Sequence, residues 1–210
     1  MNEYLTKANT AVRQEYHGEV SYDSFILEKF DWSLFDCVGV YHYRATKIED
    51  RYLEMLEPLF LFGKPVVITE FDYTTTHGGM NEEGLLSSAG LGGNNIINFW
   101  SLFLHYKIPI FGRFVRPQLK GVHARDETWQ AQKIVETLQL LDSAGVEGTL
   151  VDTFISQTRL FSENPRYDLD MTSASLVKYF EGGGHGKTFP EMRWEPKESF
   201  NEVADYYANH

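Results

Sequence analysis

One acidic residue, Glu70, directly follows a run of four β-branched residues at 66–69. A proline opens this run at position 65, and a loop rich in threonine and glycine follows it. A short apolar run of this kind predicts a buried strand of a parallel sheet. In β/α folds, the side chains at the carboxyl ends of such strands carry the chemistry. Glu70 is therefore the first candidate catalytic residue.

The elements that would position Glu70 alternate between strands and helices. Strands are expected at 19–24, 36–43, 65–71 and 147–155, and helices at 3–17, 47–62, 126–143 and 196–208. The helix predictions rest on apolar residues spaced three and four apart. This alternation predicts right-handed β-α-β units and a parallel sheet. Four strands are too few for a closed eight-stranded barrel of roughly 250 residues, so a small open sheet and half of a barrel are both compatible with the pattern.

The remaining segments have no regular pattern. A loop is expected at 72–95, an aromatic segment at 96–114, and a short helical or turn segment at 173–180. A glycine-rich linker is expected at 182–187, before the last helix. The whole chain, 1–210, is expected to form one barrel-type domain that is incomplete if it is the half barrel described above.

Composition limits the partners of the chain. A net charge of −11 argues against nucleic acid, which needs a basic surface. No stretch is long and apolar enough for a membrane span of ~20 residues, and no signal peptide is recognisable, so a cytoplasmic protein is expected. Cys37 is the single cysteine and is interpreted as a packing residue. The seven histidines are scattered without paired spacing, so neither a metal nor another cofactor is expected.

Several runs together resemble a known family. These runs are Phe-Asp-Trp-Ser-Leu-Phe-Asp-Cys-Val-Gly-Val-Tyr-His-Tyr-Arg at 30–44, Phe-Gly-Lys-Pro-Val-Val-Ile-Thr-Glu-Phe at 62–71, and Gly-Val-Glu-Gly-Thr-Leu-Val-Asp-Thr-Phe-Ile at 145–155. They are similar to the second half of a retaining β/α (TIM) barrel glycoside hydrolase. The similarity is greatest to bacterial barrel proteins labelled abortive infection proteins. It extends over most of residues 15–209.

The resemblance implies a partial (β/α)8 barrel made of strands five to eight, with the N-terminal half absent. Glu70 would then be the nucleophile of retaining hydrolysis at an O-glycosidic bond. The family's acid/base glutamate follows an asparagine at the end of strand four, and no such strand end occurs here; Asn81 and Glu82 lie in a predicted loop. Retaining hydrolysis needs two carboxyl groups about 5–5.5 Å apart. The chain is thus expected to be a fragment, a half that pairs with another chain or copy, or a decayed relative.

Four further residues are candidates for contact with a carbohydrate substrate. Tyr43 and His42 lie at the end of the predicted second strand and would flank Glu70, although a packed aromatic pair and a structural histidine are the alternatives. Tyr41 and Tyr43 share one face of the strand, and His42 points to the other. Asp152, in the fourth strand, and Asp23, at the end of the first, are polar candidates. Asp152 departs from the aromatic sugar platform that related barrels carry nearby.

Two functional classes remain open from the sequence. One is a glycoside hydrolase lineage that uses Glu70. The other is a non-catalytic binding or assembly module, in which the aromatic segment 96–114 forms an interface between copies. A truncated product is a further alternative to a hydrolase.

Overall fold

The computed structural model describes residues 1–29, 31–76, 97–108, 110, 114–121, 123–182 and 184–210. The chain divides into two compact units. Unit 1 comprises residues 1–44, 48–71 and 137–151, and unit 2 comprises residues 45–47, 72–136 and 152–210. One barrel-type domain over residues 1–210 therefore remains a prediction.

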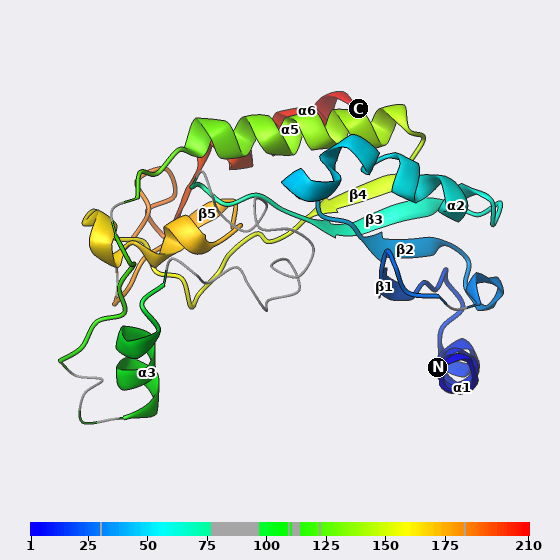
Figure 1. Cartoon of the computed structure of the whole chain (residues 1–210), viewed down its shortest axis with the longest axis horizontal. Coiled ribbons are helices and arrows are strands. Elements are labelled where there is room, and N and C mark those ends of the chain that lie inside the picture. Colours follow the sequence, from blue (N-terminus) through cyan, green and yellow to red (C-terminus); the bar gives the residue numbers. More distant parts are fainter. Residues whose placement is uncertain (30, 77–96, 109, 111–113, 122, 183) are drawn as a thin grey trace. The chain divides into compact units, whose positions relative to one another are not determined.

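Unit 1 is built around a parallel sheet of four strands, as the sequence predicts (Figure 1). The strands are β1 (Asp23–Phe25), β2 (Val38–Tyr41), β3 (Val66–Phe71) and β4 (Gly148–Val151), and they pair in this order. All three pairings are parallel, so the predicted α/β class is confirmed. β1 differs most from its prediction, because it begins at Asp23, where the predicted strand was about to end.

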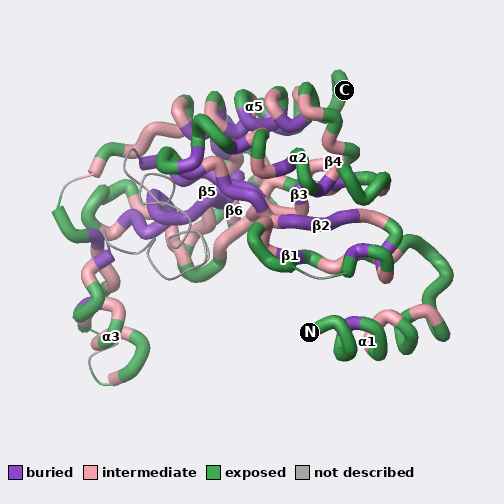
Figure 2. The backbone as a smooth tube through the Cα atoms, turned by 45° about the vertical axis from the view of Figure 1, so that its right-hand side comes forward, coloured by how far each residue is buried: buried purple, intermediate pink, exposed green. Residues whose placement is uncertain are grey.

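One face of this sheet is covered and the other is partly open. In β3, Val66 and Ile68 are at most 1% exposed, while Val67 and Thr69, which alternate with them, are half-buried. Figure 2 shows that most residues of β2, in the same sheet, are buried. The end of α5 (Glu127–Ser143) also belongs to unit 1 and contributes buried leucines. Burial of each large apolar side chain stabilises the fold by roughly 1.5–3 kcal/mol.

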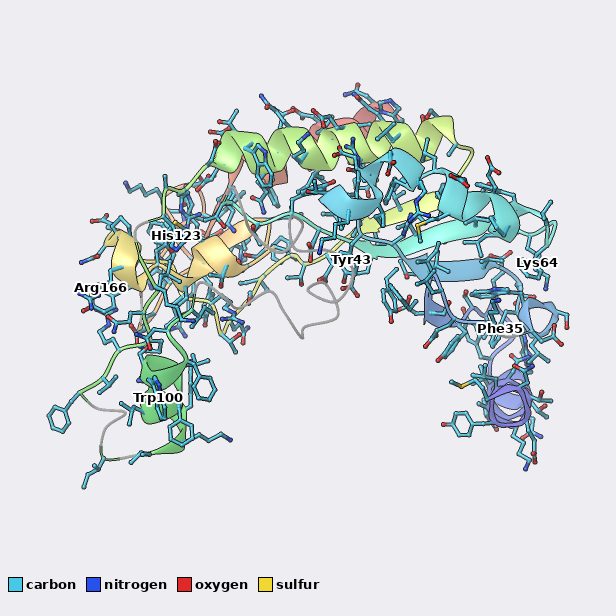
Figure 3. All side chains as sticks on the ribbon, in the orientation of Figure 1. Phe35, Tyr43, Lys64, Trp100, His123 and Arg166 are labelled. Carbon is cyan, nitrogen blue, oxygen red and sulfur yellow. The ribbon has the colours of Figure 1, made fainter. Side chains whose placement is uncertain are left out.

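The amino-terminal part of unit 1 is held by polar contacts. α1 (Asn2–Glu15) buries only Leu5, and the Asn9 amide donates to the carbonyl of Leu34 at 2.7 Å. A 3-10 turn, η1 (Trp32–Leu34), follows β1. The ammonium of Lys64 donates to the carbonyl of Trp32 at 2.9 Å and also to that of Phe35 (Figure 3). These bonds anchor the region of η1 to Lys64, which lies two residues before the start of β3.

The single helix predicted at 47–62 is wrong in detail. The segment forms two 3-10 turns, η2 (Thr46–Arg51) and η3 (Glu54–Leu56), and the short helix α2 (Glu57–Phe60). Pro58 has no N–H and cannot continue a helix from the preceding residues, so a new one starts around it. The apolar spacing is still meaningful, because Tyr52 and Leu56 are at most 1% exposed.

Unit 2 contains helices, turns and a small hairpin. Its elements are α3 (Phe99–Lys107), the first part of α5, η5 (Pro165–Tyr167), η6 (Leu169–Thr172), β5 (Val177–Tyr179), β6 (Trp194–Pro196) and α6 (Glu198–Asn209). β5 and β6 are antiparallel, so the helical or turn prediction for 173–180 is wrong. Strands of three residues are too short to show a hydrophobic period. The final predicted helix is confirmed as α6.

Two sequence expectations for unit 2 have a structural outcome. The carboxylate of Glu195 in β6 accepts hydrogen bonds from Lys187 N and from Thr188 Oγ1, the latter at 2.7 Å. The end of the expected linker, 182–187, is thus held against the hairpin. The expected loop at 72–95 is described only up to residue 76, and its remainder lies outside the described residues.

The aromatic side chains that the structure describes in the segment 96–114 are exposed. On α3, the exposed fractions of Phe99, Trp100 and Phe103 are 61%, 69% and 38% (Trp100 is labelled in Figure 3). These side chains are therefore not part of the buried core of the described residues, and the interface interpretation stays a prediction. Phe111 lies outside the described residues. In the described part of the chain, no helix has both the length and the apolar character that crossing a bilayer requires.

Candidate functional site

The candidate site lies where the parallel strands of unit 1 end. Glu70 is the penultimate residue of β3 and is half-buried. Its partner in register is Tyr41, the last residue of β2, after a bulge between Val40 and Tyr41. The backbone N–H of His42 donates to the carbonyl of Glu70 at 3.0 Å. The ends of β2 and β3 are therefore fixed to each other at the level of the carboxylate.

Asp23 reaches the same region from the other side of β2. The hydroxyl of Thr69, next to Glu70 in β3, donates to the Asp23 carboxylate. Asp23 opens β1 and lies level with Gly39, so it does not end its strand as the sequence predicted. Thr69 is a site residue that sequence reasoning missed. Its contact with Asp23 joins two strands that are not neighbours in the sheet.

Tyr41 is surrounded by acidic side chains. Burial is the largest cause that raises the pKa of its hydroxyl, and the carboxylates of Glu28, Asp23 and Glu70 raise it further. A tyrosine in such surroundings keeps its proton and is a hydrogen-bond donor at neutral pH. Its ring stacks on Phe25 at a centroid distance of 5.4 Å. Tyr41 was not among the predicted site residues, although the alternation that paired it with Tyr43 was a signal for it.

Tyr43 lies just beyond the end of β2 and is 5% exposed (Figure 3). Its ring meets that of Tyr41 edge to face, at a centroid distance of 6.2 Å. The structure thus brings the two tyrosines together, as expected for side chains on one strand face. Tyr43 supports Tyr41 from the buried side.

His42 points the other way and is 1% exposed. Its ring stacks on Tyr52 at 4.1 Å with an interplanar angle of 5°. His42 Nε2 lies 2.9 Å from the carbonyl oxygen of Tyr52, and the Tyr52 hydroxyl donates to the carbonyl of His42 at 3.0 Å. Burial lowers the pKa of His42 to about 4, so the ring is neutral at pH 7 and donates to that carbonyl. These are the contacts of a structural histidine, the alternative to a substrate contact.

Asp152 directly follows β4 and belongs to unit 2. Burial raises the pKa of its carboxyl group, and a hydrogen bond with Thr153 lowers it in part. The aromatic residue two positions on, Phe154, packs edge to face on Trp194 at 5.3 Å and on Phe200 at 6.2 Å. Asp152 is thus followed by an aromatic cluster within unit 2.

The chemistry available at this strand edge is that of carboxylates and phenols. Glu70 is the acid at the end of the strand, and Asp23 is a second acid that is bonded to the neighbouring Thr69. The carboxylates of both act on the hydroxyl of Tyr41 and raise its pKa. A carboxylate in this setting is suited to nucleophilic attack or to hydrogen bonding with sugar hydroxyl groups. Within the described ranges, no group of three histidine, cysteine or acidic side chains is arranged to hold a metal ion.

Comparison with solved structures defines the class of fold. Over its whole length the chain superimposes on a GH113 β-1,4-mannanase with a TM-score of 0.54 and 15% identity. Over 99% of its length it superimposes on a Ruminococcus gnavus β-glucuronidase with a TM-score of 0.50 and 14% identity. The chain therefore has a parallel α/β fold of the TIM-barrel type found in these glycoside hydrolases.

The likeness is one of fold, over part of each larger protein. The chain spans 52% of the mannanase chain and 29% of the glucuronidase chain. No protein-family model matches the sequence. No curated protein matches it either.

Proposed function

We propose that this chain is the strand-five-to-eight part of a glycoside hydrolase-like barrel, with Glu70 as the carboxylate that faces a carbohydrate. The observation that carries the proposal is the position of Glu70 at the carboxyl end of β3, in a parallel sheet shared with two glycoside hydrolase folds. Catalytic groups of such barrels lie at this end of the strands. The similarity to abortive infection proteins, seen in the sequence runs, belongs to the same proposal.

The proposed chemistry is retaining hydrolysis. A Glu70 oxygen attacks the anomeric carbon, the glycosidic C–O bond breaks, and a glycosyl ester forms on Glu70. Tyr41, supported by Tyr43, donates a hydrogen bond at the attacking carboxylate. Asp23 accepts hydrogen bonds from sugar hydroxyl groups. A sugar contact by Asp152, which belongs to unit 2, stays a prediction from the sequence. His42 holds the end of β2 in place through Tyr52 and through the Glu70 carbonyl.

The second carboxyl group comes, in this proposal, from a companion segment or partner chain that completes the barrel. It would act as the acid that protonates the leaving oxygen and then as the base that activates water. The reaction then needs no metal and no organic cofactor, because two carboxyl groups suffice.

A substrate with an activated leaving group tests Glu70 separately from that missing acid. Dinitrophenolate leaves as a stable anion and needs no proton from the protein, so Glu70 alone is sufficient for the first step. We expect a 2,4-dinitrophenyl 2-deoxy-2-fluoro-glycoside of the correct sugar to add one glycosyl group to the peptide that contains Glu70. A panel of mannosyl, glucosyl and glucuronosyl reagents, read by intact-mass and peptide mass spectrometry, identifies the sugar.

Glu147→Gln is the matched control for Glu70→Gln. Glu147 is exposed and precedes β4, at the opposite end of the strands, so the same chemical change there leaves the candidate site intact. We expect labelling to disappear in Glu70→Gln and to persist in Glu147→Gln. Labelling at another residue, or none with any reagent of the panel, would contradict a nucleophilic Glu70.

A second candidate function is a non-catalytic assembly module. The observation that favours it is the exposed aromatic face of α3, formed by Phe99, Trp100 and Phe103. Their rings already contact one another, with centroid distances of 5.9–6.2 Å, and so form one continuous apolar surface. Contiguous exposed aromatic surface is typical of protein interfaces. In this alternative the barrel-type sheet is kept as a scaffold and α3 joins copies of the chain.

A further inference from the structure

Unit 2 contains a groove whose chemistry differs from that of the strand edge around Glu70. Its volume is about 580 Å³. Three amide side chains, Asn98, Gln118 and Asn164, and two cationic ones, Lys120 and Arg166, line it. None of the described lining residues is acidic. This is a local reversal of charge in a chain with 30 acidic and 19 basic residues.

The groove is held together by the backbone of three segments. Asn98 N donates to the carbonyl of Gln118 at 2.8 Å, and Leu119 N donates to the carbonyl of Arg166 at 2.8 Å. Leu119 is itself buried in an apolar cluster with Ile97, Leu169 and Met171. The backbone under the polar side chains of the groove is therefore already ordered by hydrogen bonds and by this apolar cluster. A ligand would not have to order it on binding.

The acceptor oxygens of all three amide side chains already have partners inside the protein. The carbonyl oxygen of the Asn98 side chain accepts from Ser101 N at 3.2 Å, in the N-cap of α3. That of Gln118 accepts from Arg166 Nε at 2.6 Å. That of Asn164 accepts from Arg166 N at 3.1 Å.

These bonds determine what the groove offers to a ligand. With each amide oxygen engaged, the group that remains on each amide is its NH2, a donor. Arg166 keeps the donors of its terminal nitrogens, and Lys120 contributes an ammonium. Figure 3 labels Arg166 on η5, the turn that carries these contacts. A groove lined by donors and positive charge complements a group that has only acceptors and negative charge.

We propose that this groove binds a compact oxyanion, namely a carboxylate, sulfate or phosphate group, in a site independent of Glu70. Arg166 would contact the oxyanion with its terminal nitrogens, in the paired geometry that guanidinium groups make with such groups. The Gln118 and Asn164 amides would donate beside it, and Lys120 would add charge. The oxyanion has two chemical sources, a free inorganic ion or the charged group of an acidic sugar.

Titration of the full chain with defined probes tests the site and separates these sources. The probes are inorganic phosphate, sulfate, glucuronate and, as the uncharged analogue, glucose, followed by calorimetry and by the side-chain amide and Arg Nε signals in ¹H–¹⁵N spectra. We expect saturable shifts of the Gln118, Asn164 and Arg166 signals with one or more oxyanions and none with glucose. Tighter binding of glucuronate than of phosphate and sulfate identifies a sugar acid as the source, and the reverse order identifies an inorganic ion.

Gln118→Glu is the decisive variant. Its carboxylate keeps an acceptor for Arg166 Nε, so the contact that orders the guanidinium is retained, while a donor is replaced by a negative charge. We expect oxyanion affinity to fall by about tenfold or more, as for loss of a charged hydrogen bond. Arg166→Gln should show a similar loss, and Lys107→Gln, which removes one positive charge from the end of α3 outside the groove lining, should not.

Three results would overturn the proposal. They are the absence of saturable binding by any of the oxyanions, unchanged affinity in a folded Gln118→Glu variant, and an equal loss in Lys107→Gln. The last of these would indicate attraction by overall charge without a defined site.

Discussion

Gly39 has no side chain, and this allows Asp23 of β1 to reach Thr69 of β3 across the strand between them. A Cβ added at Gly39 would lie 2.7 Å from Ser21 Oγ, 2.9 Å from the carbonyl oxygen of Tyr22 and 3.3 Å from Thr69 Cγ2. Those distances leave no room for a larger residue without movement of the backbone. The polar setting of Glu70 thus depends on a glycine one strand away.

This contact also shows what could be predicted at the level of single residues. The place of Glu70 follows from its own strand, because an apolar run that ends in an acid is visible in the sequence. The Asp23–Thr69 bond depends on the register of three strands and on a bulge in the middle pair. Neither register nor bulge has a sequence signal here, so Thr69 was missed and Asp23 was placed at the wrong end of β1.

His42 leads to a prediction about pH. Its pKa is about 4 in the folded chain against an ordinary value of 6.5, so between these values the unfolded chain binds more protons. The contribution of His42 to the free energy of unfolding is therefore complete above about pH 6.5. It is lost progressively as the pH falls toward 4, by up to about 3 kcal/mol. Urea unfolding at several pH values should show that the His42→Phe variant loses this part of the pH dependence.

The comparison requires a histidine that is not buried. His17 is exposed, and His17→Gln should follow the pH dependence of the unmodified chain. At pH 7 the His42→Phe variant should lose about 1 kcal/mol with the bond to the Tyr52 carbonyl. Parallel curves for the unmodified chain and His42→Phe would mean that the buried ring is not what titrates.

Elements with a strong hydrophobic period were predicted well, and short ones were not. The predicted strand at 65–71 and helix at 126–143 differ from β3 and α5 by one residue at the start. The β5–β6 hairpin was missed because each of its strands has three residues. What holds these short elements in unit 2 is a set of buried polar contacts, which leaves no pattern in the sequence.

Asp170 is the centre of those contacts and is 0% exposed. Its carboxylate pairs with Arg125 at 2.9 Å and with Lys197 at 3.0 Å, and it accepts from Ser173 and Ser175 at 2.9 and 3.0 Å. Arg125 precedes α5, and Lys197 is the residue before α6. One carboxylate therefore joins the starts of two helices to the segment between η6 and β5.

We expect Asp170→Asn to lower the free energy of unfolding by about 3–5 kcal/mol, because it leaves the buried Lys197 and the partly buried Arg125 without their shared carboxylate. Burial already lowers the pKa of Lys197, against the effect of Asp170, so the ammonium depends on that partner. Chemical denaturation measures the change. Lys133→Gln, which breaks an exposed pair with Glu136 on α5, should cost no more than about 1 kcal/mol.

The double variant Asp170→Asn with Lys197→Met separates charge from packing. It also removes the Lys197 ammonium, which Asp170→Asn leaves without its carboxylate partner. The double variant should therefore recover part of the stability lost in Asp170→Asn. If both single variants and the double variant were equally unstable, the loss would come from packing and the carboxylate would not be the organising group.

At the scale of the whole molecule, the sequence predicted the class of fold but not its completion. Four parallel strands in chain order, separated by helical segments, were recognisable from alternation alone. Whether four more strands close the sheet depends on residues that pair with the edges of β1 and β4. The sequence of a strand does not show which other strand it pairs with. The chain's span of 52% of the mannanase is consistent with the half-barrel proposal, which the activated glycoside reagents test through Glu70.

Self-association is the prediction that belongs to this scale. An exposed aromatic side chain buries roughly 150–250 Å² at an interface, and α3 presents three of them, Phe99, Trp100 and Phe103. We expect sedimentation equilibrium to give a mass that rises with concentration, because pairing of these faces removes contiguous apolar surface from water.

Replacement of Trp100 and Phe103 by glutamine should return the chain to a monomer. Leu61→Gln, at a side chain that is 87% exposed, removes apolar surface elsewhere and should leave association unchanged. A chain that is monomeric at every concentration would exclude assembly through α3 and leave the glycoside hydrolase proposal alone.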